Sequence, residues 1–247
     1  MYAAVIRPER YGSPAGAFAV ETVAVPTIGR RQVLVWVMAA GVNFNNVWAA
    51  SGRPVDVVDH RRRRGSTDEF HIGGSDAAGV VWAVGAEVNR VQVGDEVILN
   101  PAYWDELADD IRLGADPTLS KSLQAWGYET NYGSFAQFTV VNEGQCHLKP
   151  ASLDWMSASS LLCCGGTAYR QLCTWTPHTV GPGDPVLIWG GAGGLGSAAI
   201  QFARQFGARP VGLRALGKDT GRVGSRRAAS LVRRGTGLRR GVLPGAR

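Results

Sequence analysis

A six-residue segment at 191–196, Gly-Ala-Gly-Gly-Leu-Gly, constrains the fold of this chain more than any other feature. It follows a short apolar run at 185–189, of the kind that is buried inside parallel sheets. It precedes a stretch at 197–206 whose apolar residues have helical spacing, and another strand is expected at 210–213. A strand, a glycine turn, a helix and a strand in this order predict a βαβ unit.

The glycine turn has the spacing G-x-G-x-x-G, which lets a backbone turn tightly and approach a pyrophosphate at a helix N-terminus. The sequence therefore predicts a dinucleotide site whose residues are Gly191, Ala192, Gly193, Gly194, Leu195 and Gly196. The alternative is a tight turn that binds nothing. About twenty residues after the turn, where an NAD site carries Asp or Glu, the chain has Arg214 and Lys218. Two bases and no acid favour NADPH over NAD.

The first 150 residues have a different pattern, in which short β-branched and apolar runs alternate with glycine turns. Four such runs predict strands, at 32–38, 79–85, 94–99 and 135–141. Their spacing favours a partly closed domain that resembles a β-barrel. The acidic segment 101–125 predicts a loop or lid, and a helix is expected from 152 to 169.

Composition excludes several classes of protein. With 45% hydrophobic and 19% charged residues, the chain is neither intrinsically disordered nor collagen-like. No apolar run approaches the roughly 18 residues that a membrane-spanning helix needs, and no secretory signal is visible. We therefore expect a cytoplasmic protein with no membrane partner.

The net charge of +6 hides an uneven distribution. Residues 213–247 hold nine Arg, one Lys and one Asp, so the first 212 residues carry sixteen bases and nineteen acids. A mildly acidic body makes nucleic acid an unexpected partner. The run Arg61-Arg62-Arg63-Arg64 is expected to be a solvated face.

The four cysteines make neither a disulfide framework nor a zinc site. They are Cys146, Cys163, Cys164 and Cys173, and none forms a C-x-x-C pair. We expect buried free thiols in a reducing compartment.

Several motifs resemble a known superfamily. Residues 74–85 with 93–97, Gly-Ser-Asp-Ala-Ala-Gly-Val-Val-Trp-Ala-Val-Gly and Val-Gly-Asp-Glu-Val, are similar to the signature of medium-chain dehydrogenases/reductases. Three further stretches resemble the crotonyl-CoA carboxylase/reductase branch of this superfamily; they lie at 40–49, 126–138 and 167–170. The resemblance extends from about residue 2 to about residue 212.

This resemblance implies an α/β protein with a GroES-like β-rich domain at 1–150. Residues 151–212 would then begin an incomplete, doubly wound Rossmann domain, and 213–247 would be a tail rich in Arg and Gly. It also implies NADPH, an α,β-unsaturated acyl-CoA and carbon dioxide as reactants. The family adds hydride to the β-carbon of the enoyl thioester and carboxylates the α-carbon. Family members are homo-oligomers, which we do not expect of this chain.

The resemblance also implies that no metal takes part. Zinc-dependent relatives carry Cys near the position of Asn43 and Gly-His-Glu where Gly74-Ser75-Asp76 stands. They also carry a four-Cys lobe near 95–120, which this chain lacks. Hydride transfer would then depend on positioning and on polar groups that stabilise an enolate.

Five residues receive roles from the resemblance. Asn45 matches the asparagine that holds carbon dioxide, Glu129 the glutamate that orients water in the same pocket, and Tyr128 a residue used through its backbone amide. Thr167, with Tyr169, would line the cofactor cleft. The alternatives are a turn-forming Asn, a surface carboxylate and, for Thr167 and Tyr169, core packing.

The tail departs from the family pattern. After residue 213 it has seven Gly, nine Arg and no aromatic residue, which suggests a frameshift near codon 213 and an enzyme inactive in this truncated form. The alternative is a genuine basic tail that binds phosphates nonspecifically. Two other functions stay open: a zinc-free quinone or enone oxidoreductase of the same superfamily, and a non-catalytic remnant.

Overall fold

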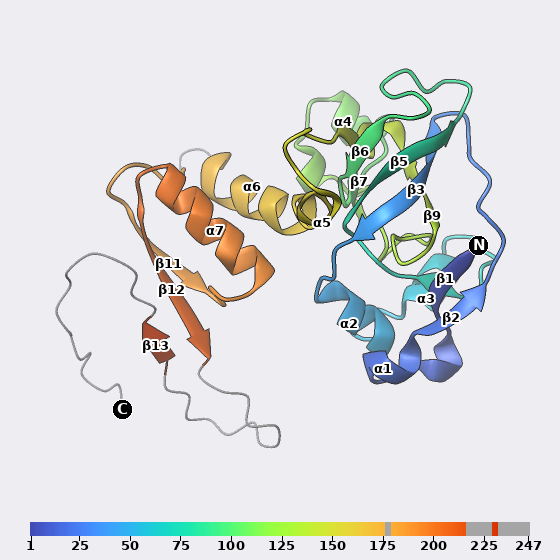
Figure 1. Cartoon of the computed structure of the whole chain (residues 1–247), viewed down its shortest axis with the longest axis horizontal. Coiled ribbons are helices and arrows are strands. Elements are labelled where there is room, and N and C mark those ends of the chain that lie inside the picture. Colours follow the sequence, from blue (N-terminus) through green and yellow to red (C-terminus); the bar gives the residue numbers. More distant parts are fainter. Residues whose placement is uncertain (176–178, 216–228, 232–247) are drawn as a thin grey trace. The chain divides into compact units, whose positions relative to one another are not determined.

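The computed structural model describes residues 1–175, 179–215 and 229–231. The chain divides into two compact units, Met1–Gly166 and a second that begins at Thr167 (Figure 1). The expected domain boundaries at 150 and 212 stay predictions, and the first unit also takes in residues 151–166.

The first unit is built on a five-stranded antiparallel sheet with the strand order β10-β6-β5-β3-β9. Its strands are β3 (Gln32–Ala40), β5 (Ala77–Val84), β6 (Glu96–Leu99), β9 (Phe138–Asn142) and β10 (Cys146–Leu148). The four apolar runs of the sequence correspond to β3, β5, β6 and β9. The last of these begins later than expected, at Phe138, because the residues before it pair with another strand: Ala4 donates to the carbonyl of Phe135, and Gln137 to that of Tyr2.

A second, three-stranded sheet with the order β2-β1-β4 lies in the same unit. It consists of β1 (Tyr2–Ile6), β2 (Ala19–Thr22) and β4 (His71–Ile72). The helices of the N-terminal part are η1 (Pro8–Arg10), α1 (Pro14–Ala17), α2 (Asn45–Ser51) and α3 (Val57–Arg62). The helix α2 follows β3 directly, so it begins at the end of the large sheet (Figure 1).

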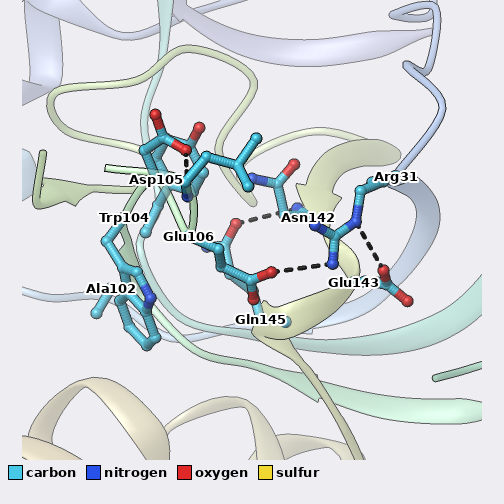
Figure 2. A pocket seen from close by; sticks show the side chains of 11 residues that line it. Arg31, Ala102, Trp104, Asp105, Glu106, Asn142, Glu143 and Gln145 are labelled. Carbon is cyan, nitrogen blue, oxygen red and sulfur yellow. Dashed lines mark hydrogen bonds and ion pairs between the residues drawn. The ribbon is translucent and has the colours of Figure 1, made fainter. Parts of the chain in front are cut away.

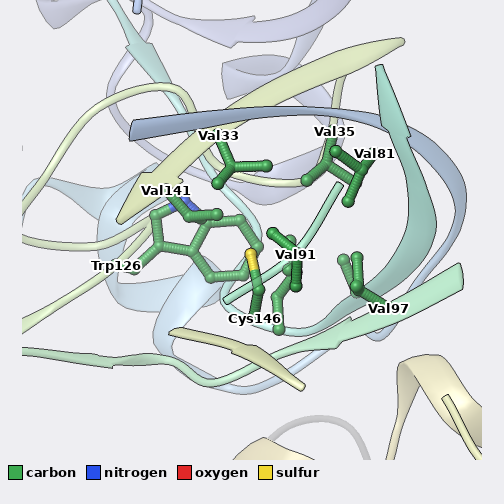
Figure 3. Packing of buried hydrophobic residues seen from close by; sticks show 10 residues of the cluster. Val33, Val35, Val81, Val91, Val97, Trp126, Val141 and Cys146 are labelled. Carbon is green, nitrogen blue, oxygen red and sulfur yellow. The ribbon is translucent and has the colours of Figure 1, made fainter. Parts of the chain in front are cut away.

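The core of the first unit lies on one face of the five-stranded sheet (Figure 3). Its members include buried side chains from alternate strand positions, Val33, Val35, Val81, Val97, Leu99, Val141 and Cys146, together with Trp126, which lies in a turn. Trp36 and Trp82, from intervening positions of β3 and β5, are 43% and 55% exposed, as the period of two in a strand requires. Removing these apolar side chains from water stabilises the unit.

The acidic segment 101–125, expected as a loop or lid, has local structure of its own. Strands β7 (Ala102–Tyr103) and β8 (Gln124–Ala125) pair antiparallel, and α4 (Asp109–Arg112) and η2 (Pro117–Leu119) lie between them. The carboxylate of Asp116 caps η2 by accepting from the backbone N–H of Thr118 at 2.9 Å. Acidic residues in this segment thus serve as local caps.

The single helix expected from 152 to 169 is wrong. The structure has α5 (Trp155–Ser159), a π-helix η4 (Leu162–Gly166) and α6 (Thr167–Cys173). Asp154 caps α5 by accepting from the backbone N–H of Ser157 at 2.7 Å. The pair Gly165-Gly166 lies where the π-helix ends, and glycines disfavour a continuous α-helix.

The arginine run is only partly a solvated face, so the expectation fails at its first residue. Arg61 is 6% exposed, and its guanidinium donates to the carbonyls of Val57 and Phe70 at 3.0 and 2.7 Å. The other three arginines of the run are exposed. Helical spacing explains the split, because only one residue of such a run faces inward.

The second unit contains the expected βαβ arrangement. Strands β11 (Pro185–Trp189) and β12 (Arg209–Ala215) are parallel and are connected by α7 (Gly194–Gln205). A third strand, β13 (Ala229–Leu231), pairs antiparallel with β12, and the other residues of the tail after 215 lie outside the described part of the chain. No helix among the described residues is long and apolar enough to cross a membrane.

Candidate functional site

The segment between β3 and α2 approaches the buried start of β5 closely. A side-chain carbon on Gly41 would lie 2.6 Å from the carbonyl oxygen of Ser159 and 2.9 Å from the Cβ of Asp76, so only glycine fits there. The backbone N–H of Gly41 donates to the carbonyl of Asp76 at 2.9 Å. This contact holds the start of α2 against residues 73–76.

Asn45, the expected carbon dioxide ligand, is the first residue of α2 and is half-buried. Its Nδ2 donates to the Oγ of Ser75 at 2.6 Å, and its Oδ1 accepts from the Nδ2 of Asn46 at 3.1 Å. Asn46 is 3% exposed and also accepts from the backbone N–H of Gly74 at 2.8 Å. The amide of Asn45 is therefore held on both sides by buried partners.

Asp76 forms a second buried cluster next to this one. It is 1% exposed, its Oδ2 lies 3.4 Å from the Nδ2 of Asn43, and its Oδ1 lies 3.4 Å from the backbone N–H of Cys163. Burial raises the pKa of Asp76 to about 6, and the hydrogen bonds only partly oppose this. Cys164 donates its thiol to the Oδ1 of Asn43 at 3.3 Å. Burial raises the pKa of the Cys163 thiol to about 12, so this sulfur stays protonated near neutral pH.

The expected residues Tyr128 and Glu129 lie in a tight turn after Trp126. Gly127 has a φ of +70°, and a side chain on it would collide with the carbonyl oxygen of Gly74. The carbonyl of Gly127 accepts from the Nε2 of His71 at 3.2 Å. Burial and nearby Arg61 lower the pKa of His71 to about 3, so its ring is neutral and Nε2 carries the proton toward Gly127.

Several hydrogen-bonding groups of Tyr128 and Glu129 already have partners within this turn. The carboxylate of Glu129 accepts from the backbone N–H of Ala125 at 2.7 Å. The backbone N–H of Tyr128 lies 3.2 Å from the carbonyl of Ala125, which also receives the N–H of Glu129 at 2.8 Å. The hydroxyl of Tyr128 is buried without a hydrogen-bond partner in the described part of the chain. Burial, with a smaller contribution from Glu129, raises the pKa of that hydroxyl.

The structure brings the turn and α2 together through aromatic rings. Trp48 lies one helical turn after Asn45, and its ring centroid is 6.5 Å from that of Tyr128 and 5.5 Å from that of Phe44. Phe44 and Trp48 are 66% and 46% exposed. An exposed aromatic surface therefore begins beside Asn45. Among the described residues, no hydrogen bond joins Asn45 to Glu129.

The glycine turn of the second unit is closely packed and includes a left-handed residue. Gly190 has a φ of +67°, and a side chain on Gly196 would collide with the carbonyl oxygen of Gly190. A side-chain carbon on Gly191 would lie 3.1 Å from the Cα of Gly212 in the neighbouring strand. The N-cap residue of α7, Gly193, offers no side chain to the first N–H groups of the helix. Those groups and the closely packed glycines fit a pyrophosphate.

The other residues expected at the cofactor site lie outside the glycine turn. Thr167 is the first residue of α6 and is exposed. Tyr169 packs its ring against Phe202 and Phe206 of the same unit, at 5.4 and 6.3 Å between centroids. Packing therefore accounts for Tyr169. The side chains of Arg214 and Lys218, on which the preference for NADPH depended, lie outside the described residues.

A pocket in the first unit is separate from these residues (Figure 2). Its lining includes Tyr103 and Trp104 and the charged residues Arg31, Glu106 and Glu143. Arg31 lies between the two carboxylates, with Nη2 2.9 Å from Glu106 and Nε 3.1 Å from Glu143 (Figure 2). None of the residues expected at the reaction site lines this pocket. Its charges are largely satisfied within the protein.

Known proteins resemble both units. The alcohol dehydrogenase GroES-like domain family matches residues 29–151. A crotonyl-CoA carboxylase/reductase of Cereibacter sphaeroides is 46% identical over 213 residues, which is 86% of this chain and 48% of that protein. The structure of the crotonyl-CoA carboxylase/reductase AntE in complex with NADP is 61% identical, with a TM-score of 0.82, over 86% of this chain and 52% of that one. The chain belongs to the medium-chain dehydrogenase/reductase superfamily, and its homologues there include crotonyl-CoA carboxylase/reductases.

A third relative has a solved structure that contains 2-octenoyl-CoA, whose acyl chain is longer than that of crotonyl-CoA. The 2-octenoyl-CoA carboxylase reductase CinF, in complex with NADP and 2-octenoyl-CoA, is 36% identical with a TM-score of 0.79 over 85% of this chain and 51% of that one. The chain thus spans about half the length of the carboxylase/reductases it matches.

The positions that the resemblance compares with the zinc ligands of zinc-dependent relatives, Asn43 and 74–76, hold one amide, one buried hydroxyl and one buried carboxylate here. Asn43 and Asp76 hydrogen-bond to each other, and among the described residues no group of three or more His, Cys, Asp or Glu side chains is placed to hold a metal ion. The absence of a metal from the reaction stays a prediction.

Sequence reasoning missed the residues that hold Asn45 in place. Asn46 and Ser75 are both buried and both contact Asn45, yet neither was expected at the site. Three asparagines within four residues were the available signal, but only Asn45 received a role, and turn formation was the one alternative considered. The other available signal was the Ser-Asp pair that follows two glycines at 73–76.

Proposed function

We propose that this chain takes part in the NADPH-dependent reduction and carboxylation of an α,β-unsaturated acyl-CoA such as crotonyl-CoA. The observation that carries the proposal is the amide of Asn45, held between Asn46 and Ser75 beside the Tyr128 turn, in a chain 61% identical to a crotonyl-CoA carboxylase/reductase. The proposal concerns the activity of the whole enzyme, since the matched relatives are about twice as long.

The cofactor would be held by the second unit. Gly191, Ala192, Gly193, Gly194, Leu195 and Gly196 would bind its diphosphate through backbone N–H groups at the start of α7, and Thr167, at the start of α6 in the same unit, would also bind the cofactor. When bound, NADPH supplies the hydride that is added to the β-carbon of the enoyl thioester. The resemblance to two carboxylase/reductases solved with NADP supports NADPH over NAD.

Asn45 would stabilise the charge that develops during carboxylation. The α-carbon of the substrate enolate forms a bond to the carbon of carbon dioxide, and the electrons of one C–O π bond move to its oxygen. An N–H of Asn45 can donate to that oxygen, and an amide does not compete as a base. The product is an alkylmalonyl-CoA. Without carbon dioxide the α-carbon takes a proton instead, and the product is a saturated acyl-CoA.

Glu129 and Tyr128 would complete the pocket around the reacting carbon. The carboxylate of Glu129 keeps one hydrogen bond to the turn backbone and has further acceptor capacity for a bound water. The backbone N–H of Tyr128 makes a longer bond to Ala125, at 3.2 Å, than the neighbouring N–H of Glu129 does. That weaker partner makes the Tyr128 amide the more readily redirected donor of the turn.

The direct test is NADPH consumption by the full chain with crotonyl-CoA, with and without bicarbonate. The proposal predicts a rate that depends on bicarbonate. A rate equal under both conditions would favour a simple enone reductase and exclude carboxylation, and no consumption would exclude the activity for this chain. Substituting a quinone or a simple enone for crotonyl-CoA provides the control for substrate class.

A further inference from the structure

Two backbone groups fix the orientation of the buried Asn46 amide, because one of them can only donate a hydrogen bond and the other can only accept one. The backbone N–H of Gly74 can only donate, and it lies 2.8 Å from the Oδ1 of Asn46. The backbone carbonyl of Asn43 can only accept, and it lies 3.1 Å from the Nδ2 of Asn46. The two contacts independently place the oxygen of Asn46 toward Gly74 and its nitrogen toward the start of α2.

This orientation is passed on to Asn45. The Nδ2 of Asn46, already fixed as a donor, lies 3.1 Å from the Oδ1 of Asn45. A reversed Asn45 amide would place one NH2 group against another. The Nδ2 of Asn45 must therefore face the opposite side, where it donates to the Oγ of Ser75 at 2.6 Å. This contact uses one of its two hydrogens, and the second has no partner in the described part of the chain.

Burial prevents water from substituting for Asn46. Its side chain is 3% exposed, and an unmade hydrogen bond at a buried amide is costly. The surrounding backbone is also shaped to fit it. A side-chain carbon on Gly73 would lie 2.8 Å from the Oδ1 of Asn46, and Gly74 has a φ of +100°. Two successive glycines thus let the backbone present its N–H group to Asn46 at close range.

We propose that Asn46 is a positioning residue that orients the Asn45 amide so that an N–H, and not the carbonyl oxygen, is available to a substrate oxygen. The inference rests on the proposed function of Asn45. An oxygen that gains negative charge needs a donor, whereas a carbonyl at the same place would repel it. Asn46, held by Gly73 and Gly74, therefore selects one of the two possible orientations of the Asn45 amide.

The variant Asn46→Asp tests this with little change in shape. A carboxylate at this position still accepts from Gly74, but it cannot donate to Asn45, so the Asn45 amide is expected to reverse and accept from the Ser75 hydroxyl. The ratio of carboxylated to saturated product is expected to fall about a hundredfold, the effect of removing one oxyanion donor. NADPH consumption without bicarbonate should fall much less, which a general loss of structure would not produce.

A second variant reaches the same residue without altering any functional group. Gly73→Ala pushes on the Oδ1 of Asn46, and we expect it to lower the same product ratio. Gly16→Ala in α1 is the matched control, because a side-chain carbon there meets nothing within 4 Å. The melting temperatures of all variants are measured, so that a change in product ratio is compared only among folded proteins.

A readout independent of activity separates this inference from the proposed function. In ¹⁵N–¹H spectra of the full chain, the side-chain NH2 signals of Asn45 are expected to shift strongly in Asn46→Asp and to stay in place in Gly16→Ala. Unchanged Asn45 signals in Asn46→Asp, or an unchanged product ratio, would overturn the inference. If the wild type forms no carboxylated product, the proposed function fails, while the spectra still decide whether Asn46 orients Asn45.

Discussion

The two candidate sites of this chain are built in opposite ways. Around Asn45 the first unit uses side chains, each held by another buried side chain or by a backbone group from a distant segment. At the glycine turn, the second unit uses backbone alone, with glycines that leave room and a helix whose first N–H groups have no side-chain cap. The first arrangement fixes one donor in one direction, and the second presents several equivalent donors to a large anion.

This difference predicts how each site responds to change. A side-chain network should lose its chemistry when one member is altered, and its stability should depend on how well each buried group is satisfied. A backbone site should tolerate changes around it but fail when a glycine gains a side chain. The following variants test this contrast, from the largest expected effect to the smallest.

Gly74→Ala is expected to have the largest effect. The new side chain would lie 2.8 Å from the Cδ1 of Phe135, collide with the Oγ of Ser134, and stand at a φ of +100°. We expect the free energy of unfolding to fall by about 4 kcal/mol, measured by urea denaturation. Gly94→Ala is the control, because Gly94 has a similar φ of +94° but open space around it. It should cost only about 1 kcal/mol, and equal losses in both variants would contradict the close packing around Gly74.

Asp76→Asn is expected to stabilise the chain at neutral pH. The pKa of Asp76 is raised from 3.8 to about 6 by burial, so the folded state holds a proton that the unfolded state has already lost. Stability therefore falls as the pH rises from about 4 to about 6, and above that range the charged form costs up to about 3 kcal/mol. Unfolding measured between pH 4 and 8 should lose this dependence in the variant. A variant less stable than the wild type at pH 8 would contradict it.

Gly196→Ala is expected to weaken cofactor binding. Its side chain would collide with the carbonyl oxygen of Gly190 and displace the turn from the start of α7. We expect the Kd for NADPH to rise about a hundredfold, or roughly 2.7 kcal/mol, measured by fluorescence titration. Gly181→Ala in the same unit is the matched control, since its nearest contact would be an ordinary 3.6 Å. An unchanged Kd in Gly196→Ala would mean that the turn binds nothing.

Tyr169→Phe is expected to have the smallest effect. The ring packs against Phe202 and Phe206, and the variant keeps this packing. Stability should change by less than about 0.5 kcal/mol, and the Kd for NADPH by less than about twofold. A large loss of NADPH affinity with unchanged stability would instead assign the hydroxyl to the cofactor cleft.

The contrast between the sites also explains what the sequence could predict. The glycine turn is local: its strand, glycines and helix are contiguous, so the pattern at 185–213 predicted β11, α7 and β12. Four strands of the large sheet were equally local, whereas β10 was not predicted. The prediction of a single helix at 152–169 was wrong because the interruption depends on a glycine pair and on contacts with β5, which periodicity does not reveal.

The network around Asn45 could not be predicted in the same way. Asn46 and Gly74 lie 28 residues apart, and their hydrogen bond exists only once β5 has been placed beside β3. The resemblance named Asn45 and Glu129 but not the residues that orient them. Arg61 illustrates the same limit, since a charged run gives no sign that one of its members is buried against Val57 and Phe70.

The most direct test of the central claim is the identity of the product that the full chain forms from crotonyl-CoA, NADPH and ¹³C-bicarbonate. Mass spectrometry distinguishes a labelled alkylmalonyl-CoA from an unlabelled saturated acyl-CoA. If Asn45 is oriented to donate to carbon dioxide, the labelled product should predominate. Saturated product alone, at any bicarbonate concentration, would contradict the assignment of this site to carboxylation.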